Sequence, residues 1–536
     1  MEEPAASPST TQVAKSAGSV GIAVFSSRIL GLIREQVMAV LFGAGTYMDA
    51  FVVAFRIPNL LRDLFAEGAL SAAFVTVFTD FDQKKGPEAT WRLANNVLIC
   101  LTLLLSVITL LGMIFSENII RIMAPDFDLI QGKIALTQLL TNIMFPFLVL
   151  ISMAAVVMGI LNTKGRFFIP AMASTFFNLG SIVGGVSLAW WAAPAFGQPP
   201  IVGMAFGTLL GGFLQLAIQL PSLQRSGFAW RPYLNLKDEG LRRIMILMIP
   251  AVIGLSATQI NIFINTNFAA RCAEGSVSWL NYAFRLMQFP IGIFGVAISI
   301  AALPVISRQV SQGDLGALKS TYVSSLIMAF LLTIPASFGL AFLAKPIIRI
   351  IFEHGRFNAA DTLHTAEALA FYAVGLFAYS SIKITVPVFY ALNDTKYPVM
   401  ASFLAVVTNI LIVSSTLEAF QHKAIAFSTS ITMIINFLFL STVLYAKVGG
   451  YNWRYLLTSM IKITFASLIM GLLTFRFHQT LGRLFNYERL GDEILALVLV
   501  IALAVSAYFL LIRWLGIKEL NEVLESLKRR FIKAQK

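Results

Sequence analysis

The chain has 536 residues, of which 57% are hydrophobic and only 12% charged, and its mean hydropathy is +0.79. A soluble globular domain is usually about a quarter charged, so this composition excludes an ordinary soluble enzyme or binding module. The net charge of +13 is better explained by positive loops that orient membrane helices and attract anionic lipids than by nucleic acid, which we do not expect as a partner.

The N-terminal segment, residues 1–17, is acidic and then rich in Ser, Thr and Pro, with no apolar core. It predicts a disordered cytoplasmic tail and not a cleavable signal peptide. Beyond it, apolar stretches recur that are long enough to cross a hydrocarbon core of about 30 Å. The expected fold is therefore an all-α polytopic membrane protein with about 14 transmembrane helices. The expected spans are 19–42, 49–79, 93–115, 134–160, 167–192, 201–221, 242–269, 277–308, 321–343, 364–391, 397–416, 424–446, 455–476 and 491–514.

An internal repeat relates the two halves of the chain at an offset of about 230 residues. AFR at 54–56 recurs at 283–285, IIRI at 119–122 recurs at 347–350, and Asn178 corresponds to Asn409. Each half holds six spans, an even number, so the two lobes share one orientation and form a parallel pseudo-repeat, a plan known among transporters. The predicted domains are an N-lobe (18–225), a C-lobe (240–450) and two additional C-terminal spans (451–515).

Lys and Arg are more frequent in the loops that lie inside when the N-terminus is inside, as the positive-inside rule requires. An even number of spans then returns the C-terminus to the cytoplasm. The last segment, 516–536, combines apolar residues at helical spacing with a Lys/Arg cluster. This pattern predicts an amphipathic helix on the inner leaflet, and a plain solvated basic tail is the alternative.

Five arginines lie inside predicted spans, where each costs about 2.5–3.5 kcal/mol at a helix centre, or about 12–18 kcal/mol together if all faced lipid. They must therefore line a wet cavity, pair with carboxylates or extend to an interface. These arginines are Arg28, Arg34, Arg56, Arg62 and Arg285.

Helical spacing distinguishes among these arginines. Asp49, Arg56 and Asp63 are seven residues apart and share one face, so acids on its own helix can neutralise Arg56. Arg62 does not fit this face on a straight helix, although a kink at Pro58 can redirect it. Glu35 adjoins Arg34 and can balance it in the same way.

Arg285 lies in a polar stripe with Asn281 and Gln288 and has no carboxylate within one helical turn. It is the strongest sequence candidate for binding an external anion. Clustered guanidinium groups bind phosphate and pyrophosphate through charge-assisted bidentate hydrogen bonds. Structural ion pairing between helices is the alternative explanation for all of these arginines.

Catalytic chemistry is not indicated. The sequence contains no nucleophile–base pair, phosphate loop or metal motif, and its four histidines are scattered without ligand spacing. We expect neither a catalytic residue nor a metal ligand, and no cofactor, although a coupling ion or the membrane potential could drive transport. Polar residues of the seventh span, such as Gln259 and Asn267, predict a hydrogen-bonded seam between helices, with a cation site as the alternative.

Three segments of the chain resemble the MurJ/MviN family of lipid II flippases, which belongs to the multidrug/oligosaccharidyl-lipid/polysaccharide exporter superfamily. The segments are SSRILGLIREQ, FGAGTYMDAFVVAFRIPNLLRDLFAEGALSAAFV and GSVSWLNYAFRLMQFPIGIFGVAI. The resemblance covers nearly the whole chain in order. It implies two six-helix lobes around a central cavity and a bacterial inner-membrane protein that moves undecaprenyl-pyrophosphate-linked lipid II outward by alternating access in peptidoglycan biosynthesis.

The resemblance also implies roles for individual residues. Its cavity arginines correspond to Arg28, Arg34, Arg62 and Arg285, which would bind the substrate. Some relatives carry Glu where this chain has Gln288, so a mechanism that needs a carboxylate there is not expected. The gating or supporting residues are expected to be Asp49, Ser27, Arg56, Glu67, Asn281 and Gln288.

Membrane lipids and cell-wall synthesis proteins are further expected partners. An exporter of another lipid-linked oligosaccharide or of amphipathic drugs is the main alternative, followed by a lipid-phosphate enzyme or a non-transporting scaffold. The energy source, the oligomeric state and the role of Lys383 stay open.

Overall fold

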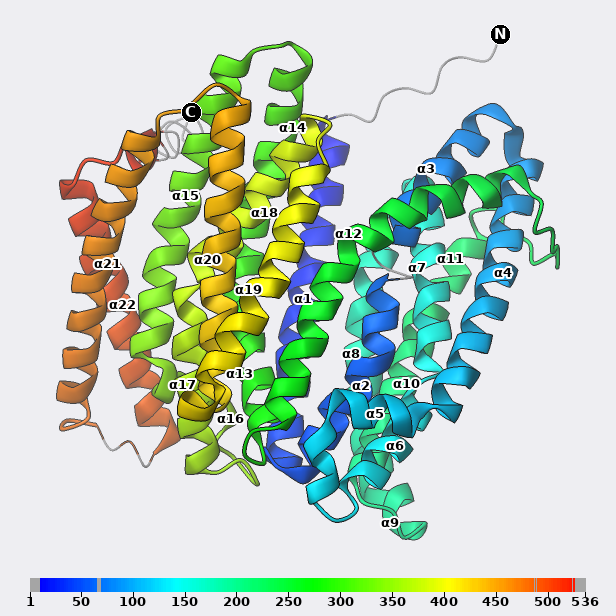
Figure 1. Ribbon diagram of the computed structural model, residues 1–536, viewed down its shortest axis with the longest axis horizontal. Helices are drawn as coiled ribbons and strands as arrows, with labels where there is room; N and C mark the ends of the chain where they lie inside the picture. The colour runs from blue at the N-terminus through cyan, green and yellow to red at the C-terminus, as the bar shows by residue number, and fades with distance from the viewer. Residues whose placement is uncertain (1–9, 65–68, 486, 488, 523, 526–536) are drawn as a thin grey trace. The chain divides into compact units, whose positions relative to one another are not determined.

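The computed structural model describes residues 10–64, 69–485, 487, 489–522 and 524–525. Within these ranges the chain folds into helices joined by short turns (Figure 1). It divides into two compact units, Met1–Gly275 and Ser276–Lys536. Each unit is described below by itself.

The first unit contains twelve α-helices among its described residues. They are α1 (Thr10–Phe42), α2 (Thr46–Arg62), α3 (Ala69–Lys84), α4 (Gly86–Ile114), α5 (Ser116–Met123), α6 (Lys133–Met144), α7 (Phe147–Thr163), α8 (Phe168–Ser187), α9 (Ala193–Ala195), α10 (Ile201–Ala217), α11 (Leu220–Gln224) and α12 (Glu239–Ala270). Two short helical turns, η2 (Pro125–Leu129) and η3 (Leu188–Ala192), complete it. Its apolar core lies among α3, α4 and α7.

The second unit contains ten α-helices among its described residues. They are α13 (Ser276–Pro290), α14 (Val296–Ser311), α15 (Leu315–Phe342), α16 (Ala344–Phe352), α17 (Ala359–Val374), α18 (Leu376–Ala391), α19 (Lys396–Phe420), α20 (His422–Lys447), α21 (Trp453–Leu481) and α22 (Leu490–Trp514). A π-helical turn, η4 (Ile291–Gly295), begins directly after Pro290 and joins α13 to α14, so the predicted eighth span is one helix with a local irregularity at that proline. The last two helices, α21 and α22, pack together at one edge of this unit (Figure 1).

The polytopic all-helical architecture is confirmed. Eleven helices in the described ranges are long and apolar enough to cross a membrane, or twelve if α17 and α18, bent by 44°, form one span. The remaining two of the fourteen expected spans correspond to α1 and to the pair α2 and α3. These segments carry the charged residues that lower hydropathy, and α2 and α3 are only 17 and 16 residues long. The count of fourteen therefore stays a prediction.

The order of helices agrees with the internal repeat. In each unit a long apolar helix is followed by a short one, α4 by α5 and α15 by α16, and the repeated IIRI falls on the short helix both times. Asn178 lies on α8 and Asn409 on α19, and each amide group hydrogen-bonds a neighbouring helix. Equivalent positions in the two halves therefore perform the same packing role.

The unit boundary differs from the predicted lobe boundary. The sequence assigns residues 240–450 to a C-lobe, whereas α12 packs against α3 and belongs to the first unit. Polar contacts explain this grouping, because Gln259 bonds Asp63 at 3.5 Å and Asn267 donates to the carbonyl of Ile122 at 2.7 Å. The inter-helix seam expected for these two residues is therefore present. The limits of the repeat-related lobes stay a prediction.

The two ends of the chain are only partly described. Helix α1 begins at Thr10, so residues 10–17 are helical and not the disordered tail expected from the sequence. Residues 1–9 and the basic cluster of 526–536 lie outside the described residues. In the described part of the tail, Ile517 is buried in the core of the second unit, and Glu519 accepts a hydrogen bond from Tyr455 at 2.7 Å.

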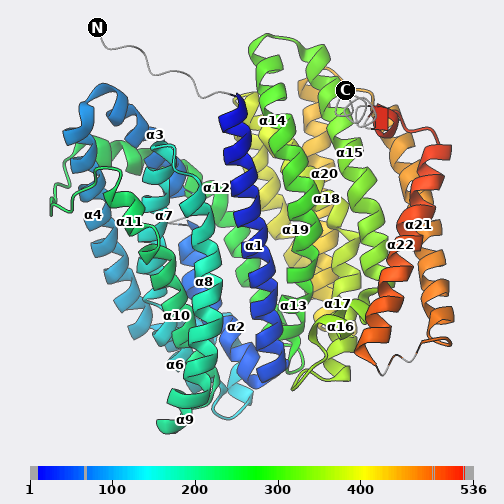
Figure 2. The ribbon, with the colours of Figure 1, turned by 180° about the vertical axis from the view of Figure 1, so that it is seen from behind.

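Glycines set the distance between α8 and α10, which lie side by side in the first unit (Figure 2). A Cβ atom at Gly207 would lie 2.3 Å from the Cα of Gly185. Such close approach of backbones is typical of helix packing in membranes, where small residues replace the hydrophobic effect as the means of association.

Gly207→Val should therefore separate α8 from α10 and lower the unfolding midpoint by several degrees. The cause is an overpacked contact, which typically costs about 1–3 kcal/mol. Thermal unfolding of the purified protein in detergent measures the change. Gly339→Ala is the control, because a Cβ at Gly339 meets no atom within 4 Å. Equal midpoints for the two variants would contradict this packing.

Candidate functional site

Helix α1 carries three of the predicted site residues and is held by α8. The side chain of Asn178 on α8 donates to the carbonyl of Ser27 at 3.1 Å, so Ser27 acts here through its backbone. Arg34 lies 5.3 Å from the ring centre of Phe177 and pairs with Glu35 at 3.0 Å. The pairing of Arg34 with its own neighbour is as the sequence predicted.

Arg28, also on α1, is half-buried. Among the residues that the structure describes, no carboxylate forms an ion pair with it, in contrast to Arg34 and Arg62. An uncompensated guanidinium in an apolar helix is costly, and an anionic ligand would remove that cost. Arg28 is therefore the arginine of the first unit that is best suited to bind an external anion, a role that the sequence predicted for Arg285.

Helix α2 carries Arg56 and Arg62, and the two guanidinium groups bond different partners. Asp63 bonds Arg62, with 2.8 Å between the nearest atoms, and Asp49 bonds a lysine. Arg56 donates to the hydroxyl of Thr266 on α12 at 2.8 Å. The two acids expected to balance Arg56 each accept a bond from another cation as well, Asp49 from Lys133 on α6 and Asp63 from the adjacent Arg62.

Arg285 lies on α13 in the second unit, where it and Asn281 are half-buried and Gln288 is exposed. The juxtaposition of Arg285 with the arginines of the first unit stays a prediction, since the units are described separately. Glu67 lies outside the described residues.

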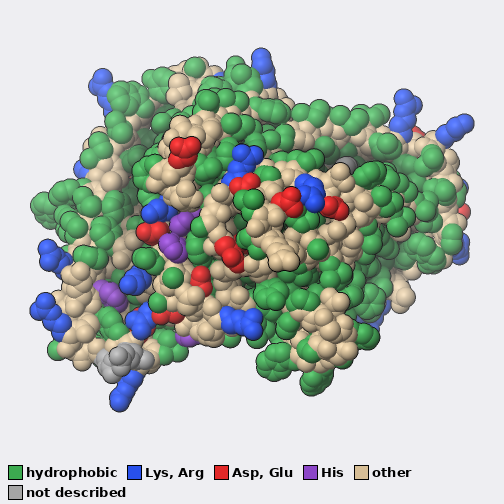
Figure 3. All heavy atoms as spheres, turned by 60° about the horizontal axis from the view of Figure 1, so that its bottom comes forward, with side chains coloured by type: hydrophobic (Ala, Val, Ile, Leu, Met, Phe, Trp, Pro, Cys, Tyr) green, Lys and Arg blue, Asp and Glu red, His purple; other side chains and the backbone are tan. Residues whose placement is uncertain are grey.

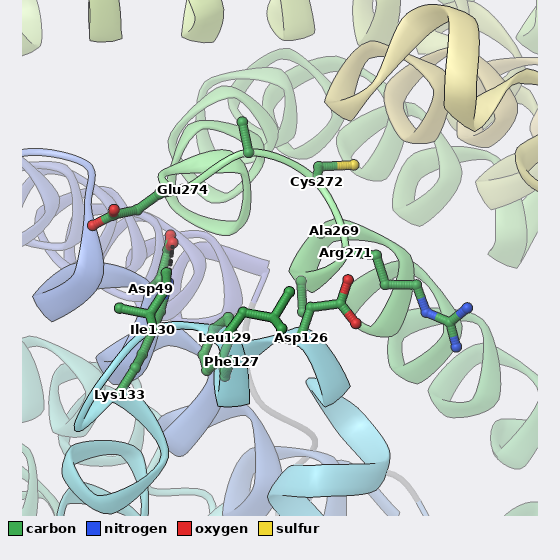
Figure 4. Close-up of a pocket in the computed structure, with 12 residues that line it drawn as sticks. Asp49, Asp126, Phe127, Leu129, Ile130, Lys133, Ala269, Arg271, Cys272 and Glu274 are labelled. Atoms are coloured by element: carbon green, nitrogen blue, oxygen red, sulfur yellow. Dashed lines mark hydrogen bonds and ion pairs between the residues drawn. The ribbon is translucent and has the colours of Figure 1, made fainter.

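A pocket of about 140 Å³ lies at the start of α2 (Figure 4). Its polar lining is Asp49, Asp126, Lys133, Arg271 and Glu274. Binding sites for organic ligands usually measure about 300–1,000 Å³, so this pocket is too small for a lipid headgroup. It can hold a few water molecules.

Asp49 and Lys133 form a buried ion pair at this pocket, 2.9 Å apart, with side chains that are only 2% and 1% exposed. Asp49 also accepts a hydrogen bond from the backbone N–H of Gly275 at 2.9 Å. The Lys133 ammonium lies 4.0 Å from the ring centre of Phe127. Asp49 thus joins the first turn of α2 to the start of α6 and to the last residue of the first unit.

Glu274 caps the N-terminus of α2. Its carboxylate accepts hydrogen bonds from the backbone N–H of Thr46 at 2.8 Å and from the hydroxyl of the same residue. These hydrogen bonds hold the pKa of Glu274 below its usual range, although partial burial acts in the opposite direction. Burial, with the nearby charge of Asp126, raises the pKa of the neighbouring Cys272 to about 12.

The sequence analysis missed Lys133 and the capping role of Glu274. Lys133 stands at the end of a predicted span, where a lysine normally anchors a helix at the interface. It lies 84 residues from Asp49, and a single sequence contains no pattern that links the two.

Removal of either partner from the buried pair should cost about 3–5 kcal/mol, because the other charge stays buried without compensation. Asp49→Asn and Lys133→Met should each destabilise the protein, and the double variant should lose clearly less than the sum of both. Unfolding in increasing concentrations of SDS measures the stability of the natural protein, the two single variants and the double variant, which together give the coupling energy. The exposed pair Lys85–Glu239, which also lies in the first unit and is 2.7 Å apart, is the matched control and should show a coupling below about 1 kcal/mol. Additive losses at Asp49 and Lys133 would contradict the coupling.

Acidic pH should weaken the cap that Glu274 provides. Its lowered pKa means that its contribution to stability is present at neutral pH and is lost as pH falls through the pKa of the folded state. Between about pH 5 and about pH 3 the unfolding midpoint of the natural protein should therefore fall more steeply than that of Glu274→Gln. Parallel profiles would show that the Thr46 bonds do not depend on the charge of Glu274.

Comparisons with known proteins agree with these features. The family model described as "Lipid II flippase MurJ" matches residues 38–490. The chain is 36% identical over 457 residues to the "Probable lipid II flippase MurJ" of Buchnera aphidicola subsp. Acyrthosiphon pisum, with 85% of this chain and 88% of the relative covered. It is 35% identical over 418 residues to the "Lipid II flippase MurJ" of Burkholderia cenocepacia, with 77% and 80% covered.

A solved structure described as "Lipid II flippase MurJ, inward closed conformation" matches with a TM-score of 0.76 and 28% identity over 91% of this chain and 98% of that chain. An inward-facing multidrug resistance MATE family transporter matches with a TM-score of 0.67 and 16% identity over 78% and 95% of the two chains, which shows a shared fold only. The chain is thus a multi-pass membrane protein and belongs to the MurJ family of lipid II flippases.

Proposed function

We propose that this protein moves lipid II, a lipid-linked peptidoglycan precursor, from the inner to the outer leaflet of the bacterial cytoplasmic membrane. It acts as a transporter and not as an enzyme. The observation that carries the proposal is Arg28, a half-buried guanidinium in α1 without a carboxylate partner among the described residues. The pyrophosphate of the substrate supplies the missing negative charge.

Arg34 and Arg62 support binding in a second way. Their side chains are 16% and 21% exposed, so they are reachable and yet already fixed by Glu35 and Asp63. A guanidinium carries five N–H donors, more than one carboxylate can use. Each of these arginines can therefore keep its acid and add bonds to a phosphate, which reduces the entropy lost on binding.

Arg285 completes the proposed set from the second unit. Half-buried on α13 together with Asn281, it lies shortly before Pro290 and the π-helical turn η4. Prolines and π-helical turns are the usual points at which a helix bends. Alternating access then consists of exposing the bound pyrophosphate to one leaflet and then to the other.

Asp49 serves as a gating residue in this proposal. Its bonds to Lys133 and to the N–H of Gly275 fix the point at which the chain leaves the first unit. A fully buried pair forms and breaks as a unit, since leaving either charge alone is expensive. Both termini are cytoplasmic in this scheme, membrane lipids surround the helices, and cell-wall synthesis proteins use the product. No cofactor is needed, and an ion gradient or the membrane potential drives the cycle.

Arg28→Ala should abolish rescue of a strain depleted of its flippase, while protein levels stay normal. The loss of one charge-assisted contact, about 1.5–3 kcal/mol, weakens binding about 10- to 150-fold. Leaflet-specific labelling of lipid II measures transport directly and separates a flippase from a scaffold or a drug exporter. Arg28→Lys tests whether charge alone suffices, and it should rescue poorly because an ammonium cannot bind phosphate through a bidentate fork.

The matched control is Arg225→Ala, which removes an exposed arginine from a loop of the same unit. It should rescue fully. Normal labelling in the Arg28→Ala strain would contradict the role of Arg28. Altered drug sensitivity with unchanged lipid II would contradict the proposed substrate.

A further inference from the structure

Three side chains that can bind a metal gather in the second unit, apart from all residues of the proposed substrate site. His364 and Glu367 lie three residues apart on one face of α17, and His422 is the first residue of α20. One ligand atom from each lies within 4.8 Å of the other two. The face of the molecule in Figure 3 shows histidine side chains next to acidic and basic ones.

His422 has the hydrogen bond that is typical of a metal ligand. Its Nε2 lies 3.1 Å from the backbone carbonyl oxygen of His364, to which an N–H at this position donates. The neutral ring then keeps a lone pair on Nδ1. Histidines that bind metals nearly always donate their other N–H to a carbonyl or a carboxylate in this manner.

His364 presents a second nitrogen with an unused lone pair or proton. Its Nδ1 is buried and has no hydrogen-bond partner within the described part of the chain. The distance from this nitrogen to Oε2 of Glu367 is 3.7 Å, which is too long for a hydrogen bond. Two ligands of a tetrahedral zinc, each about 2.0–2.1 Å from the metal, lie about 3.3 Å apart, so a small movement would suffice.

Aromatic packing holds the two imidazole rings in place. The ring centre of Trp279 lies 4.3 Å from that of His364 and 5.2 Å from that of His422. Trp279 is fixed in turn, because its indole N–H donates to Asp361 at 2.9 Å. Asp361 belongs to the capping box at the start of α17. Ligands whose orientation is fixed by surrounding contacts form a pre-organised site.

Lys423 competes with a metal ion for the carboxylate of Glu367. Its ammonium lies 3.4 Å from Oε2 of Glu367 and partly neutralises that carboxylate. A metal ion must displace or share this contact. An ion pair alone, however, explains neither the free lone pair on Nδ1 of the buried His422 nor the unbonded Nδ1 of His364.

We propose that His364, Glu367 and His422 bind one divalent transition-metal ion, with zinc as the best match, and thereby tie α17 to α20. Two imidazole nitrogens and one carboxylate oxygen form a set that zinc prefers, whereas calcium and magnesium prefer oxygen ligands only. The residues are distant in sequence, so the spacing of the histidines gave no sign of this cluster. None of its three ligands belongs to the proposed set of substrate arginines.

Zinc titration of the full-length protein in detergent, after treatment with a chelator and its removal, tests the proposal. Isothermal titration calorimetry should give one zinc per chain, and zinc should raise the unfolding midpoint. His364→Ala and Glu367→Gln should each weaken binding at least 10-fold and remove the thermal shift, whereas Lys423→Gln should strengthen binding. His354→Ala is the matched control, since His354 lies in the same unit outside the cluster, and it should bind zinc as the natural protein does.

Two results would overturn the proposal. One is the absence of zinc binding in the natural protein at micromolar concentrations. The other is binding that persists unchanged in both His364→Ala and Glu367→Gln, which would locate the metal elsewhere. Because the readouts are stoichiometry and thermal shift, they do not depend on lipid transport.

Discussion

A guanidinium in an apolar helix needs water, a carboxylate or an anionic ligand, and this requirement organises the first unit. Helix α8 supports α1 around Arg28 and Arg34, and α12 lies against α2 where it can bond Arg56 and Asp63. Were α12 to leave, the guanidinium of Arg56 would lose the hydroxyl of Thr266. The polar contacts therefore explain why a helix that the repeat assigns to the second half is packed with the first.

The ion pairs of this unit fall into two kinds that differ in exposure. Asp49 and Lys133 are almost completely buried, whereas the side chains of Arg34 and Arg62 keep 16% and 21% of their surface accessible. A buried pair resists any ligand, because a ligand would have to compete with a partner in a medium of low dielectric constant. A partly exposed pair can exchange or add a partner. Exposure thus separates the charges that hold the fold from those that can meet a substrate.

The sequence predicted the fold class and the unusual helices because both depend on local composition. Hydropathy predicted the membrane spans. The cost of placing arginines in apolar helices identified α1 and α2 as unusual, and the adjacency of the two residues predicted the pair Arg34–Glu35. The bonds from Lys133 to Asp49 and from Arg56 to Thr266 could not be predicted, since each depends on which helices touch. The repeat predicted matching elements such as α5 and α16 but not the grouping of α12. The histidine cluster could not be predicted for the same reason, because His364 and His422 meet only when α17 packs on α20.

A transporter must also return without its substrate, and the arrangement of charges bears on this step under the proposed function. If Arg28, Arg34 and Arg62 were all bare, the empty site would hold three uncompensated cations in an apolar setting, each costing about 2.5–3.5 kcal/mol. Glu35 and Asp63 keep two of them neutral when the site is empty. Of these three arginines, only Arg28 has no carboxylate partner among the described residues, so the binding of pyrophosphate changes its charge balance most. One uncompensated cation among the three attracts pyrophosphate and costs less in the empty protein than three would, which favours release as well as capture.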